Sequence, residues 1–188
     1  MVADYFREAL ELKNRLLGDA VFLAQVQKAI DIFSSAYKNG NKVLIAGNGG
    51  SAADAQHFAG EIVCTFMRRD RKGYPAIALT TDTSVITAWS NDFGYDTVFE
   101  RQVQALGNAG DVFIGISTSG NSENIILAAK KAKELGLKTV CLLGRDGGKL
   151  KDAPDVSIIV PSQSTPRIQE IHTLLVHIIC EEVEKSFV

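Results

Sequence analysis

Residues 112–135, VFIGISTSGNSENIILAAKKAKEL, decide the fold class of this chain. An apolar run from Val112 to Ser117 has the Val/Ile composition of a strand buried on both faces. A turn of serine, threonine and glycine follows, and then a helical pattern that closes at Gly136, as helices often do. A strand that feeds a helix through a short turn is the repeating unit of a parallel α/β sheet.

The same alternation extends in both directions from this segment. Four more buried strands are expected from runs of Val, Ile and Leu, at Lys42 to Ala46, Ala76 to Thr80, Thr139 to Gly144 and Val156 to Pro161. Helices are predicted at Asp4 to Leu17, Asp19 to Lys38, Ser51 to Phe66, Asp96 to Leu106, Asn121 to Leu135 and Pro166 to Lys185. We therefore expect one doubly wound, three-layer α-β-α sandwich with a five-stranded parallel sheet and two added N-terminal helices. Its ligand should bind outside the carboxyl ends of the strands.

Composition excludes several classes of protein. With 46% hydrophobic and 22% charged residues the chain can form a core, so disorder is excluded as its main state. No apolar run approaches the ~20 residues of a membrane span, and the charged start does not have the pattern of a signal peptide. A net charge of −2 with scattered basic residues argues against nucleic acid as a ligand. We interpret Cys64, Cys141 and Cys180 as reduced core residues of a cytoplasmic protein.

The last helix carries apolar residues on nearly every face. A helix that is apolar all round is buried, so either the core or a partner subunit must enclose it. Oligomer formation is therefore expected to involve helical surfaces of this kind.

Two strand-to-helix turns have the residues to hold a phosphate group. The first, AGNGGS at residues 46–51, offers backbone N–H groups at a helix N-terminus; the alternative interpretation is a capping box of Ser51 with Asp54. The second supplies the hydroxyls of Ser117, Thr118, Ser119 and Ser122, although it could also be a plain serine-rich turn with an N-cap. It contains no lysine to neutralise a transferring phosphoryl group, so we expect the phosphate to be an anchor rather than the reacting group.

The candidates for proton transfer lie on helices. Glu61 is four residues after His57, so both side chains project from one helix face, which also fits an ordinary surface pair. On the last helix, His177 and His172 lie about 80 and about 60 degrees from Gln169 in opposite senses. Geometry alone does not choose between these two histidines.

These motifs, in this order, resemble the sugar isomerase (SIS) domain and, within it, the phosphoheptose isomerase family. The resemblance rests on the two turns and on HFAGE at 57–61, GYPAIA at 73–78, NDFG at 91–94 and RIQEIH at 167–172, with His177 after it. It implies a single domain at 1–188 with a flavodoxin-like sheet, in which residues 1–40 form a helical extension for oligomerisation. It also implies a cytoplasmic homotetramer with active sites shared between subunits, without nucleic-acid or membrane partners.

The implied reaction is an aldose-ketose isomerisation through an enediol, from sedoheptulose 7-phosphate to D-glycero-D-manno-heptose 7-phosphate. This is the first step towards the ADP- or GDP-heptose of bacterial lipopolysaccharide or capsule. The implied catalytic pair is Glu61 and His177, and the implied ligands of one Zn²⁺ per subunit are His57, Glu61, Gln169 and His177. The implied substrate contacts are Asn48, Gly49, Gly50, Ser51, Glu61, Asn91, Asp92, Ser117, Thr118, Ser119, Ser122 and Gln169.

Several alternatives stay open at this point. Either Glu61 or His177 could handle the carbon proton, and zinc could shift, leave the free ligand atoms to carry protons, or act as a Lewis acid. Asn91 and Asp92 lie in a turn-like stretch that could simply be an Asx turn. A non-catalytic SIS-domain regulator or scaffold, of the kind that partners a bacterial replication initiator, would keep the phosphate turns. An isomerase of a smaller sugar phosphate would use the same turns, and the length of the pocket would decide between the two.

Overall fold

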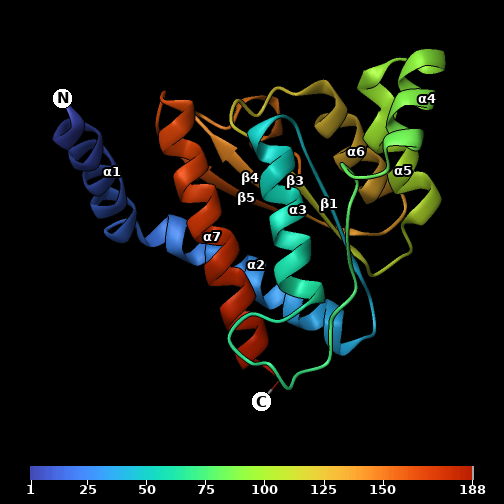
Figure 1. Ribbon diagram of the computed structural model, residues 1–188, viewed down its shortest axis with the longest axis horizontal. Helices are drawn as coiled ribbons and strands as arrows, with labels where there is room; N and C mark the ends of the chain where they lie inside the picture. The colour runs from blue at the N-terminus through green and yellow to red at the C-terminus, as the bar shows by residue number, and fades with distance from the viewer. Residues whose placement is uncertain (188) are drawn as a thin grey trace.

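A parallel sheet forms the centre of the molecule (Figure 1). The structure is a computed structural model that describes residues 1–187; Val188, the last residue of the predicted domain, lies outside the described residues. Within residues 1–187 the strands are β1 (Val43–Gly47), β2 (Ala76–Ala78), β3 (Val112–Ser117), β4 (Lys138–Gly144) and β5 (Val156–Val160). All neighbours pair in parallel, in the order β2-β1-β3-β4-β5. This is the flavodoxin-like order, so the predicted sheet is confirmed.

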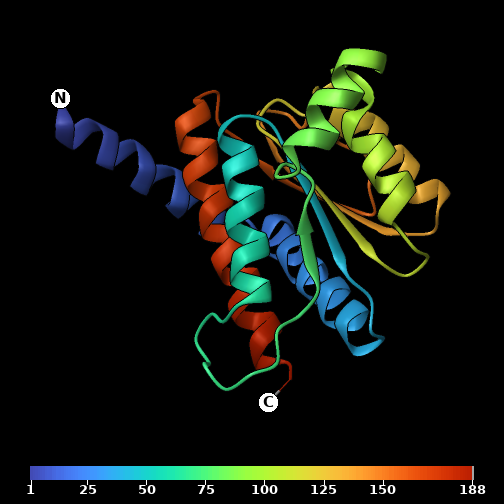
Figure 2. The same cartoon turned by 45° about the vertical axis from the view of Figure 1, so that its right-hand side comes forward.

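Helices cover both faces of this sheet (Figures 1 and 2). They are α1 (Val2–Leu17), α2 (Ala20–Lys38), α3 (Gly50–Val63), α4 (Thr83–Phe93), α5 (Val98–Leu106), α6 (Glu123–Glu134) and α7 (Thr165–Lys185), with short 3-10 turns η1 (Tyr95–Thr97) and η2 (Gly148–Leu150). Helices α2, α3 and α7 share one hydrophobic core with the sheet, and α5 and α6 share the other. Helix α1 projects from the body.

Burial explains which strands the sequence predicted well. Every residue of β1 and β3 is buried, which is why both strands are continuous apolar runs. Strand β2 lies at the sheet edge, is only three residues long and leaves Ile77 exposed. The expected strand to Thr80, covered on both faces, is therefore wrong in its length and burial.

Three further predictions need correction. Helix α3 ends at Val63 rather than Phe66, because the backbone N–H groups of the following residues bond to Glu184 instead. The sequence pattern does not indicate helix α4, and the turn-like stretch from Asn91 forms the last residues of this helix and the following Gly94. Cys64 is exposed at the end of α3, so only Cys141 and Cys180 are core residues.

Over the described residues, no helix is both long and apolar enough to cross a membrane.

Candidate functional site

The two glycine- and serine-containing turns lie next to each other because β1 and β3 are neighbouring strands. Asn48, in the first turn, and Asn124, in the first turn of α6, exchange side-chain amide hydrogen bonds of 2.9 and 3.0 Å. The Tyr95 hydroxyl also donates to Asn48 Oδ1 at 2.9 Å, and burial raises the pKa of this tyrosine. Asn48 is thus held by two neighbours, and neither Asn124 nor Tyr95 was singled out from the sequence.

The second turn separates its hydroxyl groups into internal and accessible ones. Ser117 is buried, and its Oγ accepts from the Gly120 N–H at 3.1 Å and lies 3.0 Å from Ser122 Oγ. Thr118, Ser119 and Ser122 are half-buried and can reach a ligand. Gly120 has a φ of +66°, and an added Cβ would lie 1.9 Å from the Gly147 carbonyl oxygen. Glycine at this position therefore lets the turn close against η2.

The first turn does not contain the capping box. Helix α3 begins at Gly50 with Gly49 as its N-cap, at a φ of +56°, and no side chain caps it. Ser51 is buried one residue inside the helix, and Asp54 Oδ1 accepts from Thr173 Oγ1 on α7 at 3.0 Å. The alternative interpretation, a Ser51–Asp54 capping box, is wrong because Asp54 faces α7 instead of the helix start.

Helices α3 and α7 run side by side in the same direction from the carboxyl edge of the sheet (Figures 1 and 2). Their contacts keep a constant offset along the sequence. Gln169 lies against Gly50, where an added Cβ would be 2.4 Å from its Nε2, Thr173 bonds Asp54, and His177 meets His57. We call this line of contacts the α3–α7 seam.

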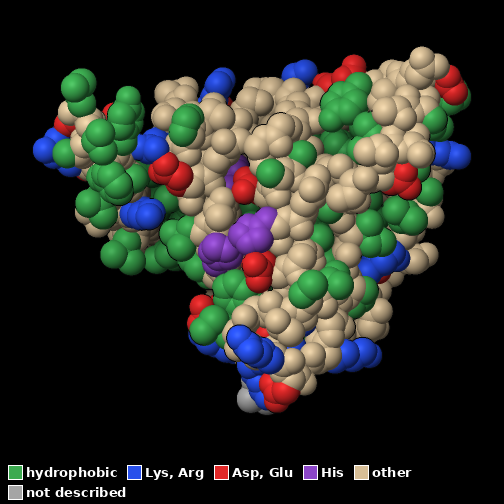
Figure 3. All heavy atoms as spheres, viewed as in Figure 1, with side chains coloured by type: hydrophobic (Ala, Val, Ile, Leu, Met, Phe, Trp, Pro, Cys, Tyr) green, Lys and Arg blue, Asp and Glu red, His purple; other side chains and the backbone are tan. Residues whose placement is uncertain are grey.

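A cluster of three side chains lies on the seam, formed by His57, Glu61 and His177. His57 Nε2 lies 3.0 Å from Glu61 Oε1 and 3.4 Å from His177 Nε2, and one ligand atom of each residue lies within 4.8 Å of the others. The side chains of His57 and Glu61 are 39% and 24% exposed. Figure 3 shows histidine and acidic side chains together at the surface over α3 and α7. The predicted catalytic pair is therefore close together within one subunit and open to solvent.

The cluster has the chemistry of a metal centre. Two imidazole nitrogens and a carboxylate oxygen are donors that zinc accepts, and catalytic zinc sites combine three protein ligands with one open position. A tetrahedral zinc with bonds of about 2.0–2.1 Å separates its ligand atoms by about 3.4 Å. The distances from His57 to its two neighbours match that spacing, so the residues present fit a divalent metal ion.

The other predicted residues lie elsewhere in the subunit. Gln169 lies beside the first turn, against Gly50, about two helical turns before His177 on the seam. Asn91 and Asp92 are exposed, at the end of α4 on the opposite face of the sheet, and their side chains bond each other at 2.8 Å. Asn91 and Asp92 therefore do not meet the cluster within one subunit, whereas Gln169 lies on the same seam as the cluster.

The geometry also chooses between the two histidines of α7. His172 is fully buried, and its Nε2 bonds the Leu143 carbonyl oxygen of β4 at 3.1 Å. His172 is therefore a core histidine. The seam brings in Asp54 as well, whose pKa is raised by burial, against opposing effects of the Thr173 hydrogen bond and the His57 charge. Sequence reasoning missed the contact between Asp54 and Thr173, which only the parallel packing of α3 and α7 creates.

Known proteins are similar to this chain over nearly its whole length. A family model described as the SIS domain matches residues 4–144. A phosphoheptose isomerase of Clostridium acetobutylicum is 55% identical over 180 residues, which are 96% of this chain and 91% of that one. The structure of a phosphoheptose isomerase from Neisseria gonorrhoeae is similar with a TM-score of 0.90 and 45% identity, covering 98% of this chain and 97% of that chain. A phosphoheptose isomerase structure from Francisella tularensis has a TM-score of 0.91 and 37% identity, with coverage of 98% and 96%.

Proposed function

This chain belongs to the SIS-domain family and, within it, to the phosphoheptose isomerases, and from that membership we propose how its own residues perform the reaction. It is an aldose-ketose isomerase that converts sedoheptulose 7-phosphate to D-glycero-D-manno-heptose 7-phosphate. The observation that carries the proposal is the convergence of Glu61, His57 and His177 on the seam of two helices that begin at the sheet's ligand-binding edge.

The isomerisation needs one group that acts at carbon and one that acts at oxygen. A proton leaves C1 of the ketose and returns to C2, while a hydroxyl proton moves between O1 and O2, through an enediol. We assign the carbon proton to Glu61, whose Oε1 faces His57 and whose Oε2 is left for the substrate. His177 then serves the oxygens, and deuterium incorporation from D₂O distinguishes this assignment from the reverse one.

The phosphate is proposed to bind between the two turns at the carboxyl edge of β1 and β3. The hydroxyls of Thr118, Ser119 and Ser122 and the N–H groups at the start of α6 are neutral donors, which suit a monoester that is held rather than transferred. Ser117 supports this turn from inside by its bond to the Gly120 N–H. In the first turn we assign substrate contacts to Asn48, Gly49, Gly50 and Ser51.

The remaining substrate contacts are proposed to need more than one subunit. Asn91 and Asp92 lie across the sheet from the seam, so we assign them, with Gln169, to sugar hydroxyls in a site shared between subunits of a homotetramer. The projecting helix α1 supports subunit contacts, since it leaves Val2, Tyr5, Phe6, Leu10 and Leu17 exposed. We also place the enzyme in the cytoplasm, at the start of ADP- or GDP-heptose synthesis for lipopolysaccharide or capsule.

The metal is proposed to be one Zn²⁺ per subunit, held by His57, Glu61 and His177, with Gln169 as a fourth ligand. Zinc bound there would supply Lewis-acid polarisation of the substrate carbonyl. His57 has no separate proton-transfer role in this scheme and serves to orient Glu61 and His177, which it contacts on both sides. A purely sugar-binding regulator would need the turns but not three convergent ligand side chains, so we favour the enzyme.

Kinetics of matched variants test this proposal. With sedoheptulose 7-phosphate, Glu61→Gln and His177→Ala should still bind substrate but lose about 10²- to 10⁴-fold in kcat. Glu182→Gln, an exposed glutamate on α7 that pairs with Lys185, is the control and should turn over normally. Wild-type rates in Glu61→Gln or His177→Ala would remove the catalytic assignment. Assays with shorter ketose phosphates and with a zinc chelator test the substrate and the metal.

A further inference from the structure

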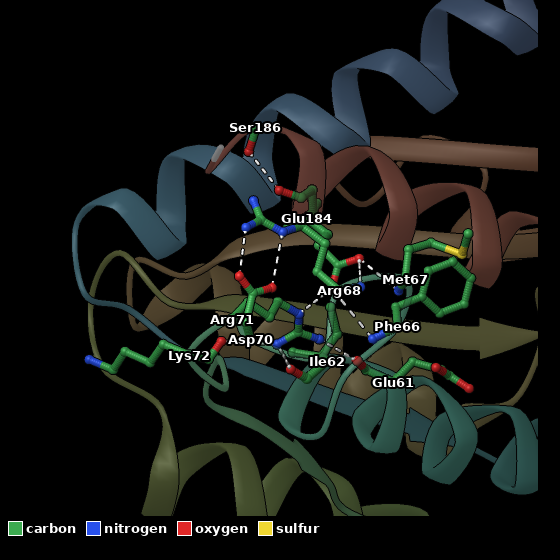
Figure 4. Close-up of polar contacts among 11 residues, drawn as sticks. Glu61, Ile62, Phe66, Met67, Arg68, Asp70, Arg71, Lys72, Glu184 and Ser186 are labelled. Carbon is green, nitrogen blue, oxygen red and sulfur yellow. Dashed lines mark hydrogen bonds and ion pairs between the residues drawn. The ribbon is translucent and has the colours of Figure 1, made fainter.

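A buried ion pair joins α3 to α7 beyond the cluster (Figure 4). Arg71, in the segment that follows α3, donates from Nε to Glu184 Oε1, near the end of α7. Their side chains are only 7% and 4% exposed. Two charges taken out of water in this way add little net stability, since a well-packed apolar pair is often as stable. The hydrogen bonds that surround the pair indicate a role other than stabilising the fold.

Arg71 caps the end of the helix that carries Glu61. Its Nη2 donates to the Glu61 carbonyl oxygen at 2.7 Å, and its Nη1 donates to the Ile62 carbonyl oxygen at 3.0 Å. Helix α3 ends at Val63, so these carbonyls are among the last four, which have no partner within the helix. A cation at a helix C-terminus also interacts favourably with the helix dipole. The guanidinium therefore fixes the backbone at Glu61 itself.

Glu184 fixes the segment that packs on His177. Its carboxylate accepts from the backbone N–H groups of Phe66, Met67 and Arg68, at 3.4, 2.8 and 3.1 Å. The Phe66 ring then lies 5.7 Å from the His177 ring, centroid to centroid. Burial alone would raise the pKa of Glu184, but the Arg71 bond and these three donors lower it below its ordinary value, so the carboxylate stays charged.

We propose that Arg71 and Glu184 are positioning residues, which set the spacing of α3 and α7 and so hold Glu61 and His177 at the distance the cluster needs. Arg71 acts on Glu61 through its backbone carbonyl, and Glu184 acts on His177 through Phe66. Neither residue contacts the reacting atoms. This inference rests on the proposed function, because it assigns the pair to the same site.

The test is the conservative variant Arg71→Lys, which keeps the positive charge but loses the planar fork that reaches Glu184 and the carbonyls of Glu61 and Ile62 together. Outer-shell partners of metal ligands typically contribute 10- to 100-fold to activity or affinity. We expect kcat to fall by about 10- to 100-fold and Zn²⁺ affinity, measured by competition with a chromophoric chelator, to fall at least about 10-fold. KM for sedoheptulose 7-phosphate should change only a few-fold, because the phosphate turns are untouched.

Asp111→Asn is the matched control. Asp111 is a buried carboxylate that pairs with Lys42 and accepts from the Lys42 and Asn108 N–H groups, at the opposite end of the strands from the proposed site. The Asp111→Asn variant should lower the melting temperature without changing kcat or Zn²⁺ affinity. If Arg71→Lys does not fold, Glu184→Gln removes the charge and replaces one of the two acceptor oxygens with an NH2 donor, and it should show the same combined loss.

The outcomes separate this inference from the function on which it rests. The positioning role would be overturned if kcat and Zn²⁺ affinity in Arg71→Lys or Glu184→Gln were no lower than in Asp111→Asn. If the positioning role failed in this way while Glu61→Gln had lost turnover, the catalytic assignment of Glu61 would still hold. Normal turnover in Glu61→Gln would instead overturn the catalytic assignment and, with it, this inference.

Discussion

Two histidines on α7, five residues apart, lie in opposite environments. His177 faces α3 across the seam, 3.4 Å from the other imidazole nitrogen of the cluster. His172 faces the sheet, fully buried, with one nitrogen on the Leu143 carbonyl oxygen. His172 Nδ1 has no hydrogen-bond partner among residues 1–187 and no route to solvent. The difference shows that a histidine in a ligand-binding cluster needs neighbouring donor atoms and access to solvent. A histidine in the core instead needs an acceptor that holds its N–H proton, as the Leu143 carbonyl oxygen does for His172.

Removing the His57 imidazole, which lies opposite His177, should have the largest effect, a loss of Zn²⁺ affinity. His57→Ala deletes the central member of the cluster, so Zn²⁺ affinity should fall by more than the about 100-fold that outer-shell changes cause. Isothermal titration with Zn²⁺ measures it. His172→Gln, the variant of the buried histidine, serves as control and should bind Zn²⁺ with wild-type affinity. Equal Zn²⁺ affinity in His57→Ala and wild type would mean that the cluster is not the metal centre.

The buried histidine should dominate a different measurement, the dependence of stability on pH. Burial lowers the pKa of His172 from 6.5 to about 4, although its bond to Leu143 acts in the opposite direction. Below pH 6.5 the unfolded chain therefore binds a proton at this position that the folded chain does not. The stability contribution of neutral His172 is present at pH 7 and is lost as the pH falls from 6.5 towards 4.

At pH 5 this loss amounts to about 2 kcal/mol of unfolding free energy. Urea unfolding at pH 7 and pH 5, at one protein concentration, checks it. Because other groups titrate in the same range, the informative quantity is the difference between wild type and His172→Gln, which should lose about 2 kcal/mol less on acidification. Identical losses in both proteins would show that His172 is not held neutral.

The smallest effect is expected in the second turn, which is proposed to bind the phosphate. Ser122 is half-buried and proposed to contact phosphate, so Ser122→Ala should raise KM for sedoheptulose 7-phosphate about five-fold, by roughly 1 kcal/mol for one lost hydrogen bond. Its kcat should stay the same, because the phosphate is an anchor. A fall in kcat with unchanged KM would place Ser122 in the chemistry instead.

The sheet could be predicted from sequence because β1, β3 and β4 are apolar runs buried on both faces, a signal that needs no tertiary information. Helix α4 could not, since Thr83–Phe93 contains no buried residue and is rich in Thr, Ser, Val and Ile, which have low helix propensity. The end of α3 at Val63 depends on Glu184, more than 110 residues later in the chain.

The site was predictable only in part for the same reason. His57 and Glu61 share a helix face, so their four-residue spacing suffices to pair them. The choice of His177 over His172 depends on which side of α7 meets α3, and helix periodicity does not contain that information. The contacts of Asp54 with Thr173 and of Arg71 with Glu61 likewise arise only when the two helices pack in parallel.

The central claim is that Glu61 moves the carbon proton of the sugar in the cluster with His177. The most direct measurement follows deuterium from D₂O into the C1 position of the ketose and the C2 position of the aldose, by NMR. Wild type should incorporate deuterium during turnover, and Glu61→Gln should bind the sugar phosphate without incorporating it. Incorporation by Glu61→Gln at the wild-type rate would contradict the account, and its loss in His177→Ala alone would support the reverse assignment of the two groups.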